Sequence, residues 1–344
     1  MKPRDLSLLV MHVSTRCDQT CGHCSIWRQG GKTARELDVA ARETIIREAH
    51  SLGARTILFT GGEPLLCDHI ERLARVSRDL GLAVQIATNG LGLARAAHWL
   101  AVTAHEIYVS LDGPEPIHDE LRGTGMYARL VASVGVLAAM PVRPRLVARS
   151  VVSRRNAPAL EQTVAAARLA GFDAISFLPI DTTSDAFGGD PGGRAVHALA
   201  GSEIEALRQG IERLARTGAL GAYVVEDERK LLEMARFLGE AASVALAPRC
   251  NAPEWSSVVE ADGSIRPCFF QPRIPAAATA TLRDVRKSVA YRESLQALGS
   301  GNRICASCVC PKHAATGPAA VAARVGELLG RVLPRAARRE VSPS

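Results

Sequence analysis

The sequence predicts an α/β fold built around a sheet of parallel strands with helices packed outside it. Six short apolar stretches alternate with stretches in which apolar residues recur at helical spacing. Strands that alternate with helices form parallel sheets, and uninterrupted apolar strands are typical of a sheet covered on both faces. The six predicted strands are residues 7–13, 56–60, 84–88, 106–111, 146–152 and 174–178.

Helices are predicted between these strands, and several end at a glycine. Gly53, Gly81 and Gly171 each follow the last apolar residue of a helical pattern, which is the usual position of a C-terminal cap. A loop rich in Asp, Ser, Thr and Gly, residues 181–193, leaves the sixth strand. The predicted helices are residues 36–52, 70–80, 93–102, 127–139, 157–170 and, after the loop, 204–214.

The alternation of strands and helices stops near residue 218. An amphipathic stretch at 231–238 is followed by a predicted hairpin, residues 257–260 and 264–267, with Asp262-Gly263 at its turn. The last segment, from Pro318, again has apolar residues at helical spacing and ends in a basic run. We therefore predict a barrel (1–216), a smaller α+β domain (217–312) and a C-terminal helix with a basic tail (313–344).

Composition and charge exclude several classes of protein. The chain has 344 residues, of which 47% are hydrophobic and 22% charged, a balance typical of globular proteins. No apolar run is long enough to span a membrane, and no signal-peptide pattern opens the chain, so we expect a cytoplasmic protein. The net charge is +7, but the basic residues cluster only in the tail and aromatics are 4%. We therefore expect no nucleic-acid partner, and we expect the tail to lie on the protein rather than on a membrane surface.

Three cysteines close together follow the first predicted strand. Cys17, Cys21 and Cys24 have the spacing C-x3-C-x2-C, so three thiolates on one loop can hold three irons of a [4Fe–4S] cube and leave the fourth iron open. Disulfides are not expected in a reducing compartment. Two alternatives stay open: a zinc site completed by His12 or His23, and buried thiols without a metal.

This loop, together with Gly61-Gly62-Glu63-Pro64 directly after the second strand, resembles the radical S-adenosylmethionine (SAM) superfamily. The resemblance covers roughly residues 7–180. It implies a partial (βα)6 barrel in which the open iron chelates the amino and carboxylate groups of SAM. The absence of a Cβ at the two glycines lets the backbone approach a ligand closely. The residues that the resemblance assigns to cofactor binding are His23, Gly61, Gly62, Glu63, Pro64, Asn89, Ser110, Asp112 and Arg122.

A second group of cysteines lies in the smaller domain and resembles the auxiliary-cluster domain called twitch, a shortened relative of SPASM. The resemblance implies a second [4Fe–4S] cluster without an open iron, which would transfer an electron. Zinc held by four thiolates is the structural alternative. The implied ligands are Cys250, Cys268, Cys305 and Cys308, with Cys310 as a possible substitute for Cys308.

The function that we expect is that of a radical SAM oxidoreductase. Such an enzyme takes hydrogen from a carbon of a small molecule or a peptide and needs an external electron donor such as flavodoxin or ferredoxin. Asp181 and Asp185, on the loop after the sixth strand, are candidate catalytic carboxylates. A two-cluster electron carrier and a zinc-stabilised binding module are the alternatives from other functional classes.

Overall fold

A computed structural model describes residues 6–29, 36–181, 186, 194–239, 251–275 and 281–296. The predicted C-terminal helix and basic tail (313–344) lie outside these residues, as does most of the loop 181–193. The fold is α/β, as predicted, and one sheet of eight strands runs through it in the order β6-β5-β4-β3-β2-β1-β7-β8. No helix among the described residues is both long and apolar enough to cross a membrane.

All six predicted barrel strands are present, and each pairs in parallel with the next along the chain. This arrangement confirms the barrel part of the sequence prediction. Because the strands are parallel, the loops after all six of them meet at one edge of the sheet. The strands are β1 (Leu8–Ser14), β2 (Thr56–Gly61), β3 (Ala83–Thr88), β4 (Glu106–Ser110), β5 (Arg145–Val152) and β6 (Ala174–Pro179).

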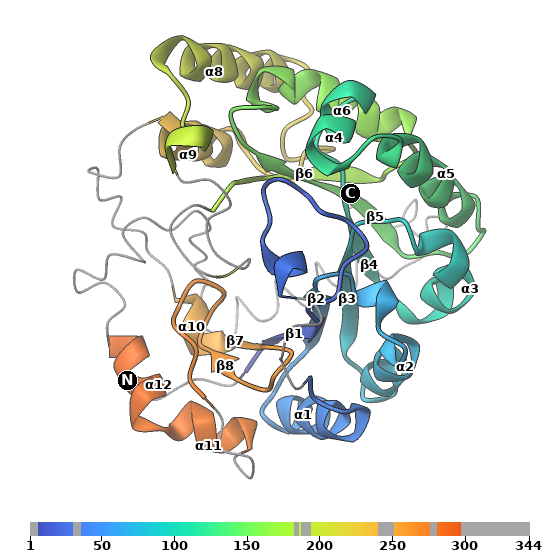
Figure 1. The fold of residues 1–344 in the computed structure, drawn as a ribbon, viewed down its shortest axis with the longest axis vertical. Coiled ribbons are helices and arrows are strands. Elements are labelled where there is room, and N and C mark those ends of the chain that lie inside the picture. Colours follow the sequence, from blue (N-terminus) through green and yellow to red (C-terminus); the bar gives the residue numbers. More distant parts are fainter. Residues whose placement is uncertain are drawn as a thin grey trace, which may run out of the picture.

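Helices form an arc around the outer side of the sheet, and the loop after β1 lies inside this arc (Figure 1). α1 begins where the Asp38 side chain accepts a hydrogen bond from the backbone N–H of Ala41. Two α-helices within residues 1–216, α4 and the short α7, were not predicted. The helices are α1 (Val39–Ser51), α2 (Ile70–Asp79), α3 (Leu93–Thr103), α4 (Glu115–Arg122), α5 (Met126–Ala138), α6 (Leu160–Leu169), α7 (Arg194–His197) and α8 (Gly201–Arg216), with short 3-10 helices η1 (Ile26–Arg28), η2 (Pro64–Leu66) and η3 (Ala157–Ala159).

The two faces of the barrel sheet differ in polarity. Successive side chains of a strand point to opposite faces of the sheet. On the outer face, residues such as Leu9, Phe59 and Ile86 belong to the apolar core. The strand register places a second set of residues on the opposite, inner face of the sheet, where polar side chains are frequent. Polar residues on this face include His12, Gln85, Glu106, Tyr108, Arg149 and Ser176.

The hairpin predicted after residue 256 is present as β7 (Ser256–Val259) and β8 (Ile265–Arg266), which pair antiparallel. At its turn Gly263 has φ +88°, and the Asp262 side chain accepts the backbone N–H of Ser264 at 2.9 Å. Unexpectedly, β7 also pairs in parallel with β1 and so extends the barrel sheet. The domain boundaries themselves stay a prediction. The remaining described helices are α9 (Glu228–Gly239), α10 (Ala252–Trp255), α11 (Leu282–Lys287) and α12 (Val289–Gln296).

Candidate active site

The cysteine loop, residues 15–25, leaves β1 at the edge of the sheet where the strand-end loops meet. Glu36 holds its first residues, because its Oε1 accepts hydrogen bonds from the Ser14 hydroxyl at 2.8 Å and the Thr15 N–H at 3.0 Å. Behind the loop, the buried Arg42 guanidinium donates to the carbonyl of Val13 at 2.6 Å. The start of the cysteine loop is therefore held by two charged side chains, Arg42 of α1 and Glu36 just before this helix.

Gly61 and Gly62 lie directly against this loop. A Cβ on Gly61 would lie 2.3 Å from the Ser14 carbonyl oxygen, and one on Gly62 would lie 2.2 Å from that of Arg16. Two backbone hydrogen bonds of 2.8 Å, from Gly62 N to Ser14 O and from Glu63 N to Arg16 O, keep the segments together. Glycine is therefore required at both positions because a side chain would clash with the cysteine loop. This is a different requirement from the expected one, which was close approach to a ligand. Their contact with SAM stays a prediction.

Glu63 connects the loops after three strands. Its carboxylate accepts hydrogen bonds from the Leu65 N–H at 2.9 Å, and from the Thr88 hydroxyl and the Asn89 N–H at 2.7 Å each. Burial raises the pKa of Glu63 to about 7, although these three donors counteract it. The Asn89 amide in turn donates to Asp18 in the cysteine loop at 2.6 Å. Glu63 therefore holds the loops after β2 and β3 together, and Asn89 links them to the cysteine loop.

Arg122, the last residue of α4, joins the loop after β4 to the cysteine loop. Its Nε lies 2.6 Å from Asp112 Oδ2, and both side chains are buried. Its Nη1 donates to Gln19 Oε1 at 3.3 Å and approaches the Cys21 sulfur at 3.6 Å. His23 lies on the same cluster, with its Nε2 at 3.9 Å from Asp112 Oδ2. Three residues that the resemblance assigned to cofactor binding thus meet at the cysteine loop.

The three thiols of the loop lie in a partly buried environment. Burial raises the pKa of Cys17 to about 11 and also raises the pKa values of Cys21 and Cys24. The positive charge of Arg122 counteracts this effect at Cys21. A metal that binds these sulfurs must displace their protons, because the thiolate is the ligand form.

One polar atom beside the thiols has no hydrogen-bond partner. Gln19 is 3% exposed, and its amide nitrogen Nε2 makes no hydrogen bond. The amide oxygen Oε1 accepts a hydrogen bond from Arg122, and this contact distinguishes the oxygen from the nitrogen. An iron–sulfur cube carries sulfide acceptors that such a donor could bind, so this environment fits a cluster. In the part of the chain that the structure describes, no three His, Cys, Asp or Glu side chains converge closely enough to hold a single metal ion. A cube does not require such convergence, since each thiolate binds a different iron.

Residues 11–167, which contain the cysteine loop and the turn that packs on it, match the family model of the radical SAM superfamily. The match assigns residues 11–167 of this chain to that superfamily. This assignment favours the enzyme interpretation over the electron carrier and the zinc-binding module. The family-model match covers part of the predicted barrel and ends before β6.

Two of the curated relatives of this chain are named for different activities. The chain is 30% identical over 168 residues to the AdoMet-dependent heme synthase of Methanosarcina barkeri. The aligned segment is 48% of this chain and 48% of that protein. The chain is also 31% identical over 166 residues to the PqqA peptide cyclase of Ruegeria pomeroyi. This aligned segment is 47% of this chain and 44% of that protein. The chain therefore spans about half the length of the curated relatives that it matches.

Solved structures extend the likeness of the fold beyond the barrel. Streptococcus suis SuiB bound to its precursor peptide SuiA matches with a TM-score of 0.66 at 17% identity, over 90% of this chain and 72% of SuiB. The enzyme anSMEcpe with bound AdoMet matches with a TM-score of 0.65 at 18% identity, over 96% of this chain and 98% of that protein. At such identities the likeness concerns the fold alone.

The remaining predicted residues are only partly described. Ser110 ends β4 and faces Arg149 of β5, and Asp181 follows β6 at the same edge of the sheet. Pro64 begins η2. Cys268 is half-buried and lies two residues after β8. The residues outside the described part are Asp185, Cys250, Cys305, Cys308 and Cys310, so the auxiliary ligand set stays a prediction.

Sequence reasoning missed three residues of this region. Gln19 was treated as a spacer between cysteines, and Glu36 only as the start of a helical pattern. Glu260, near the end of β7, forms an ion pair with His12 of β1 at 2.9 Å. A buried Glu opposite a buried His on paired strands can be found only once the pairing of β1 with β7 is known, so no local signal indicated it.

Proposed function

We propose that this chain cleaves SAM reductively and uses the product to remove hydrogen from a substrate carbon. The observation that carries the proposal is the cysteine loop, which is packed on Gly61-Gly62 and has an unpaired buried donor, Gln19, beside its thiols. Cys17, Cys21 and Cys24 would hold a [4Fe–4S] cluster. When bound, the cluster supplies one electron to SAM, which yields methionine and a 5′-deoxyadenosyl radical.

The protein's own contribution is positioning. Arg122 and Asp112 fix the middle of the cysteine loop, while Glu63 and Asn89 fix its beginning through Asp18. His23 and Ser110 lie at the same edge of the sheet, where SAM would bind between the loops. We assign these residues to SAM binding on the resemblance, and their location at one edge supports that assignment. A radical must be kept from water, so we expect the substrate to bind on the inner side of the sheet, beside these loops.

Peptides are the substrate class that the comparisons support best. One group of relatives consists of peptide cyclases, and SuiB was solved with its precursor peptide. The heme synthase relative and the Fe-coproporphyrin III synthase from the same organism favour a second candidate, a tetrapyrrole side chain. The two candidates differ in size and charge, so a direct comparison separates them.

We further propose an auxiliary [4Fe–4S] cluster at Cys250, Cys268, Cys305 and Cys308, with Cys310 as a possible substitute for Cys308. Its chemistry would be the removal of one electron from the substrate radical, and flavodoxin or ferredoxin would act as the external donor to the enzyme. The only support that the described residues give is the position of Cys268, which follows the hairpin that pairs with β1. Asp181 and Asp185 remain the proposed carboxylates near the substrate.

The test of SAM cleavage is anaerobic reconstitution followed by measurement of 5′-deoxyadenosine with dithionite as reductant. Replacement of Cys17, Cys21 and Cys24 by Ala should abolish its formation. Cys67→Ala is the matched control, because Cys67 is a buried free thiol outside the loop. Formation of 5′-deoxyadenosine by the triple variant at the wild-type rate would disprove the assignment.

The auxiliary cluster is tested by metal content. Two [4Fe–4S] clusters require about eight irons per chain, and Cys268→Ala should lower this to about four while 5′-deoxyadenosine formation persists. A wild-type protein with about four irons and one zinc would overturn the second cluster and leave the first. Peptides and iron porphyrins, each added to the wild-type enzyme, should then differ in how strongly they stimulate 5′-deoxyadenosine formation, with product mass as the second readout.

A further inference from the structure

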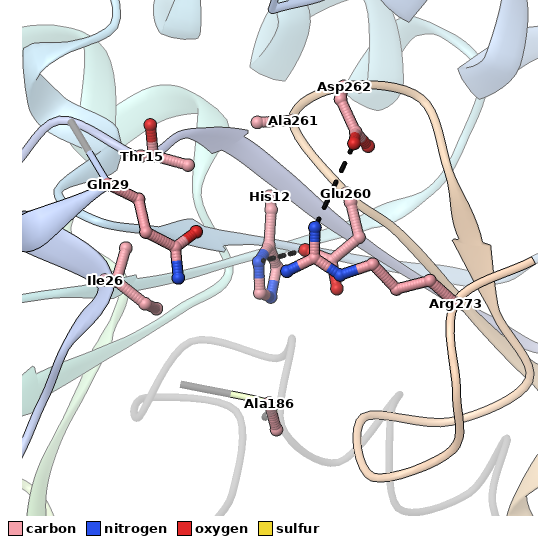
Figure 2. A pocket seen from close by; sticks show the side chains of 9 residues that line it. All are labelled: His12, Thr15, Ile26, Gln29, Ala186, Glu260, Ala261, Asp262 and Arg273. Carbon is pink, nitrogen blue, oxygen red and sulfur yellow. Dashed lines mark ion pairs between the residues drawn. The ribbon is translucent and has the colours of Figure 1, made fainter. Parts of the chain in front are cut away.

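A pocket lies between the end of β1 and the β7–β8 hairpin, beside the cysteine loop. Figure 2 shows that one wall comes from the cysteine loop and η1, and the other from the hairpin turn and Arg273, with His12 between them. The roles proposed above for SAM binding leave this pocket unused. The lining residues are His12, Thr15, Ile26, Gln29, Ala186, Glu260, Ala261, Asp262 and Arg273.

His12 is held in one orientation inside this pocket. Its Nδ1 lies 2.9 Å from Glu260 Oε2, and its ring packs against that of Phe269 with 5.6 Å between centroids. Glu260 is fixed in turn by the fully buried Arg266, whose Nε donates to it and whose Nη1 donates to the carbonyl of Gln271 at 2.8 Å. The imidazole therefore has little freedom to rotate.

The second ring nitrogen of His12 has no partner. His12 is 6% exposed, yet its Nε2 makes no hydrogen bond. Figure 2 shows this nitrogen pointing away from Glu260, toward the side of the pocket where Ala186 lies. When the neutral ring donates its Nδ1–H to the carboxylate, a lone pair remains on Nε2. A buried polar atom without a partner is costly in a folded protein, so one that persists indicates a ligand.

We propose that this pocket is a substrate subsite in which His12 Nε2 accepts a hydrogen bond from an N–H or O–H group of the substrate. The proposal rests on the proposed function, in which that group is an amide N–H of a peptide. Thr15 places the subsite directly next to the start of the cysteine loop. Phe269, the residue after Cys268, packs against His12. A substrate anchored here lies between the two loops that we assign to the two clusters.

Paired small probes test the subsite without knowledge of the substrate. N-methyltrifluoroacetamide carries the N–H of a peptide group, whereas N,N-dimethyltrifluoroacetamide lacks it. Their binding to the reconstituted, oxidised enzyme is measured by ligand-observed fluorine NMR. The wild-type protein should bind the first probe roughly three- to tenfold more tightly than the second, the ratio expected for one hydrogen bond to a neutral acceptor. Equal binding of the two probes, or no binding of the first, overturns the proposal.

Two substitutions at residue 12 locate the preference. His12→Phe should abolish the ratio between the probes, because it keeps a ring against Phe269 but has no acceptor. His12→Gln should keep part of the ratio, since its amide oxygen can accept. His50→Phe, at an exposed position on α1, is the matched control and should leave the ratio unchanged. If the ratio between the probes persists in His12→Phe, the role of His12 is overturned. If His12→Phe does not fold, the comparison of the two probes on the wild-type protein decides.

The probe result and the proposed function can fail separately. If the wild-type enzyme makes no 5′-deoxyadenosine, SAM cleavage is disproved, while the probe ratio still decides the role of His12. If SAM cleavage occurs but the probe ratio is absent, the subsite is disproved and the proposed function stands. A peptide that stimulates 5′-deoxyadenosine formation should also displace N-methyltrifluoroacetamide, and a failure to compete overturns the link between pocket and substrate.

Discussion

Replacement of Glu260 by Gln should destabilise the join between β1 and the β7–β8 hairpin. Glu260 is 7% exposed and contacts two cationic or potentially cationic side chains, His12 and Arg266. Burial alone would raise its pKa, but the hydrogen bonds and charges of His12 and Arg266 lower it from 4.5 to about 2. Gln keeps the shape of the side chain and removes the charge, so the substitution isolates the electrostatic contribution.

The magnitude follows from this difference in pKa between the unfolded and folded states. Each unit corresponds to about 1.4 kcal/mol, so ionised Glu260 stabilises the fold by roughly 3 kcal/mol at pH 7. Since the folded pKa is the lower one, this contribution is complete above about pH 4.5 and is lost as the pH falls toward 2. At pH 3 roughly 1.4 kcal/mol should remain.

Urea unfolding followed by circular dichroism, on wild type and Glu260→Gln side by side at pH 7, 5 and 3, measures this contribution. Glu71→Gln is the control, because Glu71 pairs with Arg75 on the exposed surface of α2, where ion pairs contribute little. The difference between wild type and Glu260→Gln should be largest at pH 7 and 5. A difference below about 1 kcal/mol at pH 7, or one that does not shrink at pH 3, would refute the reasoning.

Two further predictions concern the cysteine loop. Gly62→Ala places a Cβ 2.2 Å from the carbonyl oxygen of Arg16, so it should reduce both iron content after reconstitution and thermal stability. Gly135→Ala, in α5 with no atom within 4 Å of the added Cβ, should instead stabilise by up to about 1 kcal/mol in the same melt. Arg122→Gln leaves the charge of Asp112 buried and should cost about 3–5 kcal/mol in urea unfolding. The double variant with Asp112→Asn should recover part of that loss; no recovery would show that the pair is not coupled.

Local patterns were sufficient to predict the barrel. Each strand is a short apolar run, and the helices between them carry periodic apolar residues and glycine caps, so both kinds of element are encoded within a few residues. Helix α4 was missed because its sequence, EPIHDELR, is mostly polar and follows the turn-like Asp112-Gly113-Pro114. Its burial depends on Arg122 and His118, whose partners lie elsewhere in the chain.

The parts of the candidate site that lie on one loop were predictable from the sequence. The contacts between residues of different strands were not. The cysteines were identified from their spacing and Gly61-Gly62 from the resemblance, although the glycines accommodate the cysteine loop itself. His12 was considered only as a possible zinc ligand. Its partner Glu260 comes from a strand whose parallel pairing with β1 leaves no trace in the residues near either one.

The pairing of β1 with β7 has a consequence for how the chain folds during its synthesis. Leu8 aligns with Ser256, so one edge of the first strand has no partner until about 250 further residues have left the ribosome. At typical elongation rates this takes on the order of 10–50 s. During that interval β1 can pair only with β2, and its other edge is open to wrong strands. Contacts of such long sequence separation form late and slowly, so completion of the sheet is the expected slow step in folding.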